Sequence, residues 1–135
     1  METFAARRSN LETLTALAEA LNQHDIDAAM SLMADDCVFL ASFGPELDGT
    51  SYRGRDAVRR GLEALLEIYP DLHYGDMRVL VDGDTGAAGW TMTGTDSRSG
   101  ERVKVRGCDL FELADGKITR KDAFRKERHT PDSTS

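Results

Sequence analysis

The hydrophobic pattern of this chain changes at Pro70, a residue type that ends a helix because its ring blocks the next helical hydrogen bond. Before Pro70, apolar residues recur at helical spacing in three segments, which predicts helices over 10–22, about 25–35 and about 55–69, with one strand over 37–43. After Pro70 the spacing is that of strands, over 72–81, 86–95, 101–113 and about 117–126, with Gly- and Asp-containing turns between them. Helices followed by an antiparallel meander predict the α+β class.

Two of the predicted helices carry start signals. Ser9 or Asn10 can cap the first helix, and Asp25 can cap the second, because a short polar side chain accepts hydrogen bonds from the first free backbone N–H groups. We therefore expect the first helix to begin near Asn10.

Length and charge limit the class of protein. The 135 residues fit one domain, over 1–135, with 1–8 and 127–135 expected to fray. Seventeen basic and 24 acidic residues give a formal charge of −7, which disfavours nucleic acid and anionic membranes as partners.

Cys37 and Cys108 are too few for a disulfide framework, and no apolar stretch has the length of a signal core or a membrane span. These features favour a cytoplasmic protein.

The strand over 101–113 contains the main candidate for a catalytic residue, Asp109. Its alternating residues 103, 105, 107, 109, 111 and 113 form the more apolar face, which predicts that they point inward and that Asp109 lies among apolar neighbours. A carboxylate in such a place is costly unless it is paired, hydrogen-bonded or protonated. General acids and donors to a developing oxyanion are carboxyl groups of this kind.

The partner of Asp109 depends on the next hairpin. If Asp115-Gly116 is a two-residue turn, Asp109 lies opposite Asp122. If Ala114-Asp115-Gly116 is a three-residue loop, the register shifts by one and Asp109 lies opposite Lys121, with Ala123 and Arg125 also pointing inward. Lys121 and Asp122 are thus both candidate catalytic partners of Asp109.

Four stretches in the same order resemble the NTF2-like superfamily, in its SnoaL-like (polyketide cyclase-like) and ketosteroid isomerase-like branches. They are ADDCVF (34–39), YRGRDAV (52–58), WTMTGT (90–95) and FELADGKI (111–118), and the resemblance spans about 11–125. It implies a cone in which three N-terminal helices pack in a curved, mostly antiparallel sheet around a pocket. It also implies a homodimer through the outer sheet face, and it favours the register that pairs Asp109 with Lys121.

This sequence lacks several catalytic residues of the enzymes that it resembles. In ketosteroid isomerase-like members the carboxylic acid that hydrogen-bonds the substrate oxygen aligns with Asp109, but their tyrosine donor aligns with Leu17 and their general base with Ala41. In epoxide hydrolase-like members one of the acids aligns with Ala123. A polyketide cyclase-like activity, which requires little beyond an acid/base carboxylate in a shaped pocket, survives these departures best.

A pocket wall can be named from strand alternation and from the resemblance. We expect it to be formed by Phe39, Ala41, Phe43, Tyr52, Trp90, Met92, Val105, Phe111, Ala123 and Arg125. The three histidines have no metal-binding spacing. The sequence therefore predicts a cofactor-free and metal-free acid/base enzyme (cyclase, isomerase or dehydratase type) acting on a small apolar or ring-containing carbonyl compound. The alternative is a non-catalytic binding protein or a dimeric scaffold.

Overall fold

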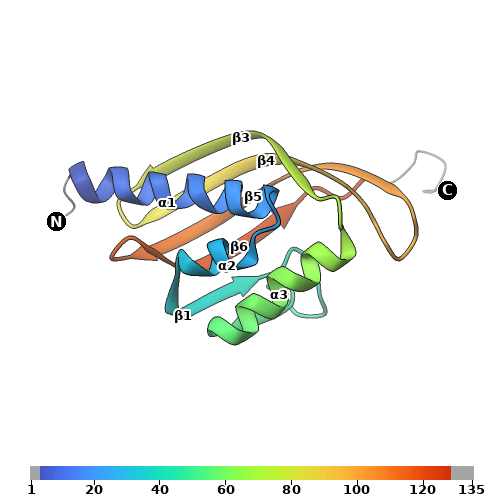
Figure 1. Ribbon diagram of the computed structural model, residues 1–135, viewed down its shortest axis with the longest axis horizontal. Coiled ribbons are helices and arrows are strands. Elements are labelled where there is room, and N and C mark those ends of the chain that lie inside the picture. Colours follow the sequence, from blue (N-terminus) through green and yellow to red (C-terminus); the bar gives the residue numbers. More distant parts are fainter. Residues whose placement is uncertain (1–3, 129–135) are drawn as a thin grey trace.

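The structure, a computed structural model, describes the backbone of residues 4–128 and the side chains from Asn10 to Arg128. Its elements follow the chain as α1 (Phe4–Asn22), α2 (Ile26–Ser31), β1 (Met33–Leu40), β2 (Ser51–Arg53), α3 (Arg55–Ile68), β3 (His73–Asp82), β4 (Thr85–Thr95), β5 (Arg102–Ala114) and β6 (Lys117–Arg125). This is an α+β fold, as predicted (Figure 1).

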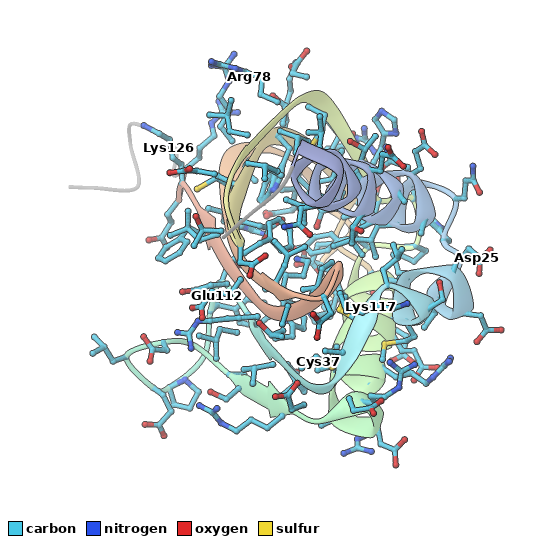
Figure 2. All side chains as sticks on the ribbon, turned by 90° about the vertical axis from the view of Figure 1, so that its left-hand side faces the viewer. Asp25, Cys37, Arg78, Glu112, Lys117 and Lys126 are labelled. Atoms are coloured by element: carbon cyan, nitrogen blue, oxygen red, sulfur yellow. The ribbon has the colours of Figure 1, made fainter. Side chains whose placement is uncertain are left out.

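One six-stranded sheet forms the body of the described chain. Its strand order is β2-β1-β6-β5-β4-β3, and every neighbouring pair is antiparallel except β1 and β6, which run parallel. Figure 2 shows that the strands curve and that α1 and α3 lie on one side of them. A single core of apolar side chains lies between the helices and the sheet. The inner face of β5 therefore points toward the helices, as alternation predicted.

The helices differ from the expected arrangement in two ways. The third does not join the first two at the N-terminal side, because β1 and β2 come before it, and α2 has only six residues. Helix α1 begins at Phe4, six residues before the predicted start, so residues 4–8 are helical rather than frayed.

Of the other residues expected to fray, 127 and 128 lie beyond the last strand, and 1–3 and 129–135 fall outside the described part.

Asn10 is an interior residue of α1 and not its cap. Its side-chain amide is almost fully buried and donates to the backbone oxygen of Gly83, at 3.0 Å, and to Oδ1 of Asp84, at 3.1 Å. The polar side chain that resembled a cap thus ties α1 to the turn between β3 and β4. Asp25 does cap α2, because its Oδ1 accepts from the backbone N–H of Ala28 at 3.0 Å.

Strand β1 begins and ends earlier than predicted. It starts at Met33 because parallel pairing with β6 begins there, where Met33 lies opposite Ile118. It ends at Leu40, so Ala41 and Phe43 lie in the loop that follows, and Phe43 is 52% exposed. Their side chains are placed by this loop and not by strand alternation.

The hairpin between β5 and β6 follows neither predicted register. Asp115 and Gly116, with φ of 51° and 75°, form a two-residue turn in which Ala114 lies opposite Lys117. Thr119 is then an extra residue, because Leu113 pairs with Ile118 whereas Glu112 pairs with Arg120. This bulge places Ala123 opposite Asp109 and Lys121 opposite Phe111.

Candidate functional site

A buried ion pair joins β5 to β6. Nζ of Lys121 lies 3.1 Å from Oδ1 of Asp109, and the two side chains are 2% and 7% exposed. The indole Nε1 of Trp90 donates to the other carboxylate oxygen of Asp109 at 3.0 Å. Both oxygens of Asp109 therefore act as acceptors, which offsets part of the cost of burying the charge.

The ammonium of Lys121 also faces an aromatic ring. It lies 4.7 Å from the ring centroid of Phe39, within the range of a cation–π contact. The Phe39 ring stacks on Tyr52 with centroids 5.6 Å apart. Gly61 of α3 allows this stack, because a Cβ at that position would lie 2.7 Å from the Tyr52 ring and 2.9 Å from the Phe39 ring. Lys121 is thus fixed by a carboxylate on one side and by a ring on another.

A cavity of about 60 Å³ lies against this ion pair. Strands and loops contribute Phe39, Ala41, Ser42, Phe43, Tyr52, Tyr74, Trp90, Met92, Lys121, Ala123 and Arg125 to its wall, and α3 contributes Gly61, Ala64, Leu65 and Ile68. The wall is mostly apolar, as is usual for small-molecule sites. Its charged members are both cations, and Asp109 is not part of the wall, although its hydrogen-bond partners Lys121 and Trp90 are.

Tyr74 is a buried tyrosine of the cavity wall. Its side chain is buried, its ring lies 4.9 Å from that of Trp90, and its hydroxyl has no hydrogen-bond partner among the described side chains. Burial raises the pKa of this phenol well above its ordinary value, and the neighbouring charge of Asp109 raises it further. The hydroxyl is therefore protonated at neutral pH and free to donate to a ligand.

Arg125 marks the outer end of the same cavity. Its Nη1 donates to the hydroxyl of Tyr69 at 3.1 Å, and its guanidinium lies 5.7 Å from the Tyr69 ring centroid. Tyr69 is buried at the C-terminal end of α3. Arg125 and the loop residues Ser42 and Phe43 also line a second, larger hollow.

Besides Asp109, three predicted site residues lie away from the cavity wall. Val105 is buried and lines the larger hollow. Phe111 is buried in the core. Asp122 lies opposite Leu110 on the other face of the sheet, where partial burial raises the pKa of its carboxyl, with Arg120 acting in the opposite direction.

Sequence reasoning missed six residues of the wall, which are Ser42, Gly61, Ala64, Leu65, Ile68 and Tyr74. Two of them could have been found from the sequence. Tyr74 belongs to a predicted strand, and a buried tyrosine beside Leu72 at strand spacing was the available signal. Gly61 sits on the inner face of the predicted third helix, where a glycine costs helix stability and so indicates close packing.

The described residues include neither a metal-binding cluster nor a membrane-spanning helix. Within 10–128, no three His, Cys, Asp or Glu side chains gather as they would to hold a metal ion. None of the helices in the described part is long and apolar enough to cross a membrane.

Solved structures with the same fold are numerous. A protein proposed to be a polyketide cyclase from Xanthomonas campestris pv. campestris is 23% identical, with 88% of this chain and 91% of that chain covered and a TM-score of 0.78. A protein proposed to be a SnoaL-like polyketide cyclase from Jannaschia sp. CCS1 is 21% identical, with 93% and 91% covered and a TM-score of 0.79. A phenazine biosynthesis-related protein from Pseudomonas aeruginosa is 22% identical, with 93% and 80% covered and a TM-score of 0.79.

At these identities the structures show the fold. No curated protein matches the chain. The sequence pattern of the SnoaL-like domain, however, matches residues 14–121, which include α3, all of β3, β4 and β5, and the Lys121 of the ion pair. This chain belongs to the SnoaL-like domain family.

Proposed function

We propose that this chain binds one small, mainly apolar molecule that carries a carbonyl oxygen, and that it catalyses cofactor-free acid/base chemistry of the cyclase, isomerase or dehydratase type. The observation that carries the proposal is the buried ammonium of Lys121 in an otherwise apolar cavity wall, held in place by Asp109. Fixed donors in a mostly apolar wall favour a transition state in which an oxygen gains negative charge.

Each polar group has a distinct role in this proposal. Lys121 donates to the carbonyl oxygen of the ligand, and the hydroxyl of Tyr74 is a second donor. Asp109 is a positioning residue, because both of its oxygens are already engaged by Lys121 and Trp90. The wall contains no carboxylate among the described residues, so the proton that leaves the carbon next to the carbonyl passes to water at the cavity mouth. Asp122, on the other face, has no part in the reaction.

The test begins with native mass spectrometry of the purified protein to identify a retained molecule. That molecule is then incubated with the protein in D₂O, and NMR follows exchange of the hydrogens beside its carbonyl group. We expect Asp109→Leu/Lys121→Met, which removes both charges together, to abolish exchange. Tyr74→Phe should slow exchange roughly tenfold, the effect of losing one donor hydrogen bond.

Lys117→Met is the matched control, since Lys117 lies on the same strand but is exposed and outside the cavity wall. Exchange that persists unchanged in the double variant would rule out the role of Lys121.

A non-catalytic binding protein is the second candidate. It is favoured by the same absence of a carboxylate from the described cavity wall, together with Leu17 and Ala41 at the positions where ketosteroid isomerase-like members carry their donor and base. A retained molecule that binds tightly but shows no exchange above the rate in buffer alone would favour this candidate.

We further propose that two copies associate through the outer sheet face. Leu80, Ala87 and Leu110 lie side by side on neighbouring strands of this face, and Leu80 and Leu110 are 65% and 48% exposed. Phe124, 47% exposed, extends the apolar surface. Leu110→Asp should therefore convert a dimer into a monomer in analytical ultracentrifugation.

A further inference from the structure

The cavity is too small to enclose a ring-containing ligand by itself. Its volume is about 60 Å³, whereas an apolar cavity that holds benzene measures about 150 Å³. A ligand of the proposed kind must therefore extend out of it. The hollow that shares Ser42, Phe43 and Arg125 with the cavity, which we call the vestibule, has a volume of about 1110 Å³.

The vestibule is cationic on a protein that is acidic overall. Its wall contains six basic residues (Arg98, Arg102, Lys104, Arg125, Lys126 and Arg128) and three acidic ones (Asp96, Glu101 and Glu127). The formal excess of three positive charges contrasts with −7 for the whole chain. Such a local excess attracts an anion that the rest of the surface repels.

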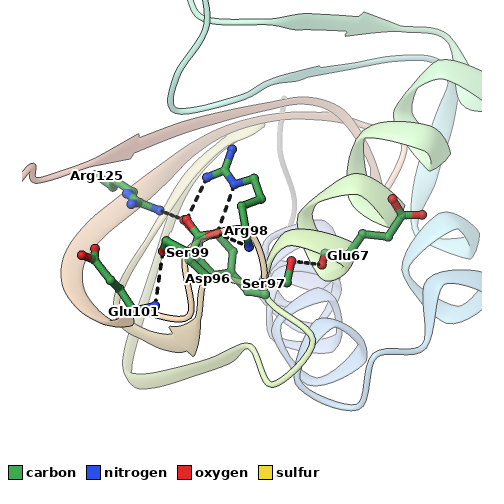
Figure 3. A network of polar contacts seen from close by, with 8 residues as sticks. Glu67, Asp96, Ser97, Arg98, Ser99, Glu101 and Arg125 are labelled. Atoms are coloured by element: carbon green, nitrogen blue, oxygen red, sulfur yellow. Dashed lines mark hydrogen bonds and ion pairs between the residues drawn. The ribbon is translucent and has the colours of Figure 1, made fainter.

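Two of these cations are already neutralised. Arg98 turns onto Asp96, as Figure 3 shows, with Nη2 2.9 Å from Oδ2 and Nε 3.1 Å from Oδ1. This pairing lowers the pKa of Asp96 to about 2. Arg102 lies 2.9 Å from Oδ2 of Asp71. Neither is available to a ligand without breaking an ion pair.

Arg125 differs from them in position and in partner. It is half-buried at the junction of the cavity and the vestibule, and it forms no ion pair with a described side chain. Among the described residues its side chain donates only to the hydroxyl of Tyr69, and that hydroxyl has no acceptor of its own there. A guanidinium fork beside a hydroxyl donor suits the two oxygens of a carboxylate.

We infer that Arg125 and Tyr69 bind a carboxylate of the ligand, so that the ligand is an acid whose apolar end enters the cavity and whose carboxylate lies at the vestibule. The inference rests on the small-molecule cavity of the proposed function and narrows its substrate class. A single unpaired guanidinium balances one negative charge, which favours a carboxylate over a phosphate. Lys104 and Lys126 are exposed on the vestibule wall, where they add to the positive potential that attracts an anion.

The test compares two probes of the same shape, 3-phenylpropanoate and the neutral 3-phenylpropanamide. Trp90 is the sole tryptophan and lines the cavity, so its fluorescence and its indole NMR signal report binding there. We expect the wild-type protein to bind the carboxylate roughly tenfold more tightly than the amide, as for a charge-assisted hydrogen bond. Arg125→Gln should reduce this ratio to about one, chiefly by weakening the binding of the carboxylate.

Two further variants serve as controls. Arg125→Lys retains the charge, controls for misfolding and should keep part of the preference. Arg78→Gln removes an exposed arginine of β3 that lines none of the hollows described here and should keep all of it (Figure 2).

The outcomes separate the inference from the proposed function. Equal binding of both probes to the wild-type protein would overturn the carboxylate subsite and leave the cavity as a binding site. A preference that survives Arg125→Gln would overturn the role of Arg125. If neither probe perturbs Trp90 at millimolar concentration, the cavity does not bind such molecules, and the proposed function falls together with the inference.

Discussion

At the scale of single residues, the Asp109–Lys121 pair is costly because both of its charges are buried. Two opposite charges, 7% and 2% exposed, have lost their hydration, and their attraction and hydrogen bonds must offset that loss. Apolar residues of similar size at both positions can be as stable as such a pair or more so. A pair of this kind is therefore more readily explained by what Lys121 does at the cavity wall than by stability.

The first prediction follows from this balance. Asp109→Leu alone leaves a buried ammonium without its counter-ion and should reduce the free energy of unfolding by about 3–5 kcal/mol. Adding Lys121→Met removes the unpaired charge and should restore most of that loss. Urea denaturation measures both variants, and a double-mutant cycle gives the coupling.

The surface pair Asp27–Arg59 provides the control. Its side chains are 88% and 39% exposed, so Asp27→Leu should cost less than about 1 kcal/mol. If Asp109→Leu were as mild as Asp27→Leu, the pair would not be energetically buried.

The sequence allowed the burial of Asp109 to be predicted but not its role. Strict alternation along β5 places residue 109 inward whatever the neighbouring strand does. Which groups meet it depends on β6 and β4, and the contact with Trp90 depends on Gly107, where any Cβ would collide with the Trp90 ring. Contacts of this kind depend on how neighbouring strands pack, so they cannot be predicted from the alternation within a single strand.

At the scale of elements, the end of α1 is fastened to the edge of the sheet by one side chain. The amide of Asn22 donates to the backbone oxygen of Tyr74 at 3.0 Å, and its oxygen accepts from the Tyr74 backbone N–H at 2.8 Å. Strand β3 is an edge strand, whose outward backbone groups would otherwise lack partners. Asn22 thus holds in place the strand that carries the cavity tyrosine.

The second prediction concerns this attachment. Asn22→Ala leaves both backbone groups of Tyr74 without these partners and should destabilise the protein by about 1–3 kcal/mol. Amide hydrogen exchange at Tyr74 should become faster. Thr15→Ala removes an exposed hydrogen bond within α1 and should change stability by no more than about 0.5 kcal/mol. Equal effects of the two substitutions would show that Asn22 does not anchor β3.

The boundaries of the strands after Pro70 were predicted well, but the bulges inside two of them were not. The strands after Pro70 begin and end within two residues of the predicted positions. In β3, however, two residues lie opposite Trp90, and the bulge begins at Asp76, whose φ is 52°. In β6 the extra residue Thr119 has the same effect. Gly75 directly precedes the bulge in β3 and was the available signal there, whereas no glycine or proline marks the bulge in β6. A shift of one residue exchanges the two faces of a strand.

At the scale of the whole molecule, three buried or partly buried acids have their pKa shifted in the same direction. Burial raises the pKa of the thiols of Cys37 and Cys108 and of the phenol of Tyr74. The folded protein therefore retains protons that the unfolded chain releases as the pH rises past the ordinary values, about 8.5 for a thiol and about 10 for a phenol. Above those values the unfolded state binds fewer protons, so the free energy of unfolding must fall with rising pH.

The third prediction is a steep loss of stability on the alkaline side, beginning between about pH 8.5 and 10. Tyr74 has the largest of the three shifts, so Tyr74→Phe, which has no phenol to ionise, should show a flatter decline above pH 10 than the wild-type protein. Urea denaturation from pH 7 to pH 11, with each protein referred to its own stability at pH 7, measures the two slopes. Parallel slopes would mean that the Tyr74 hydroxyl reaches solvent in the folded state, and it could then no longer serve as a protected donor in the cavity.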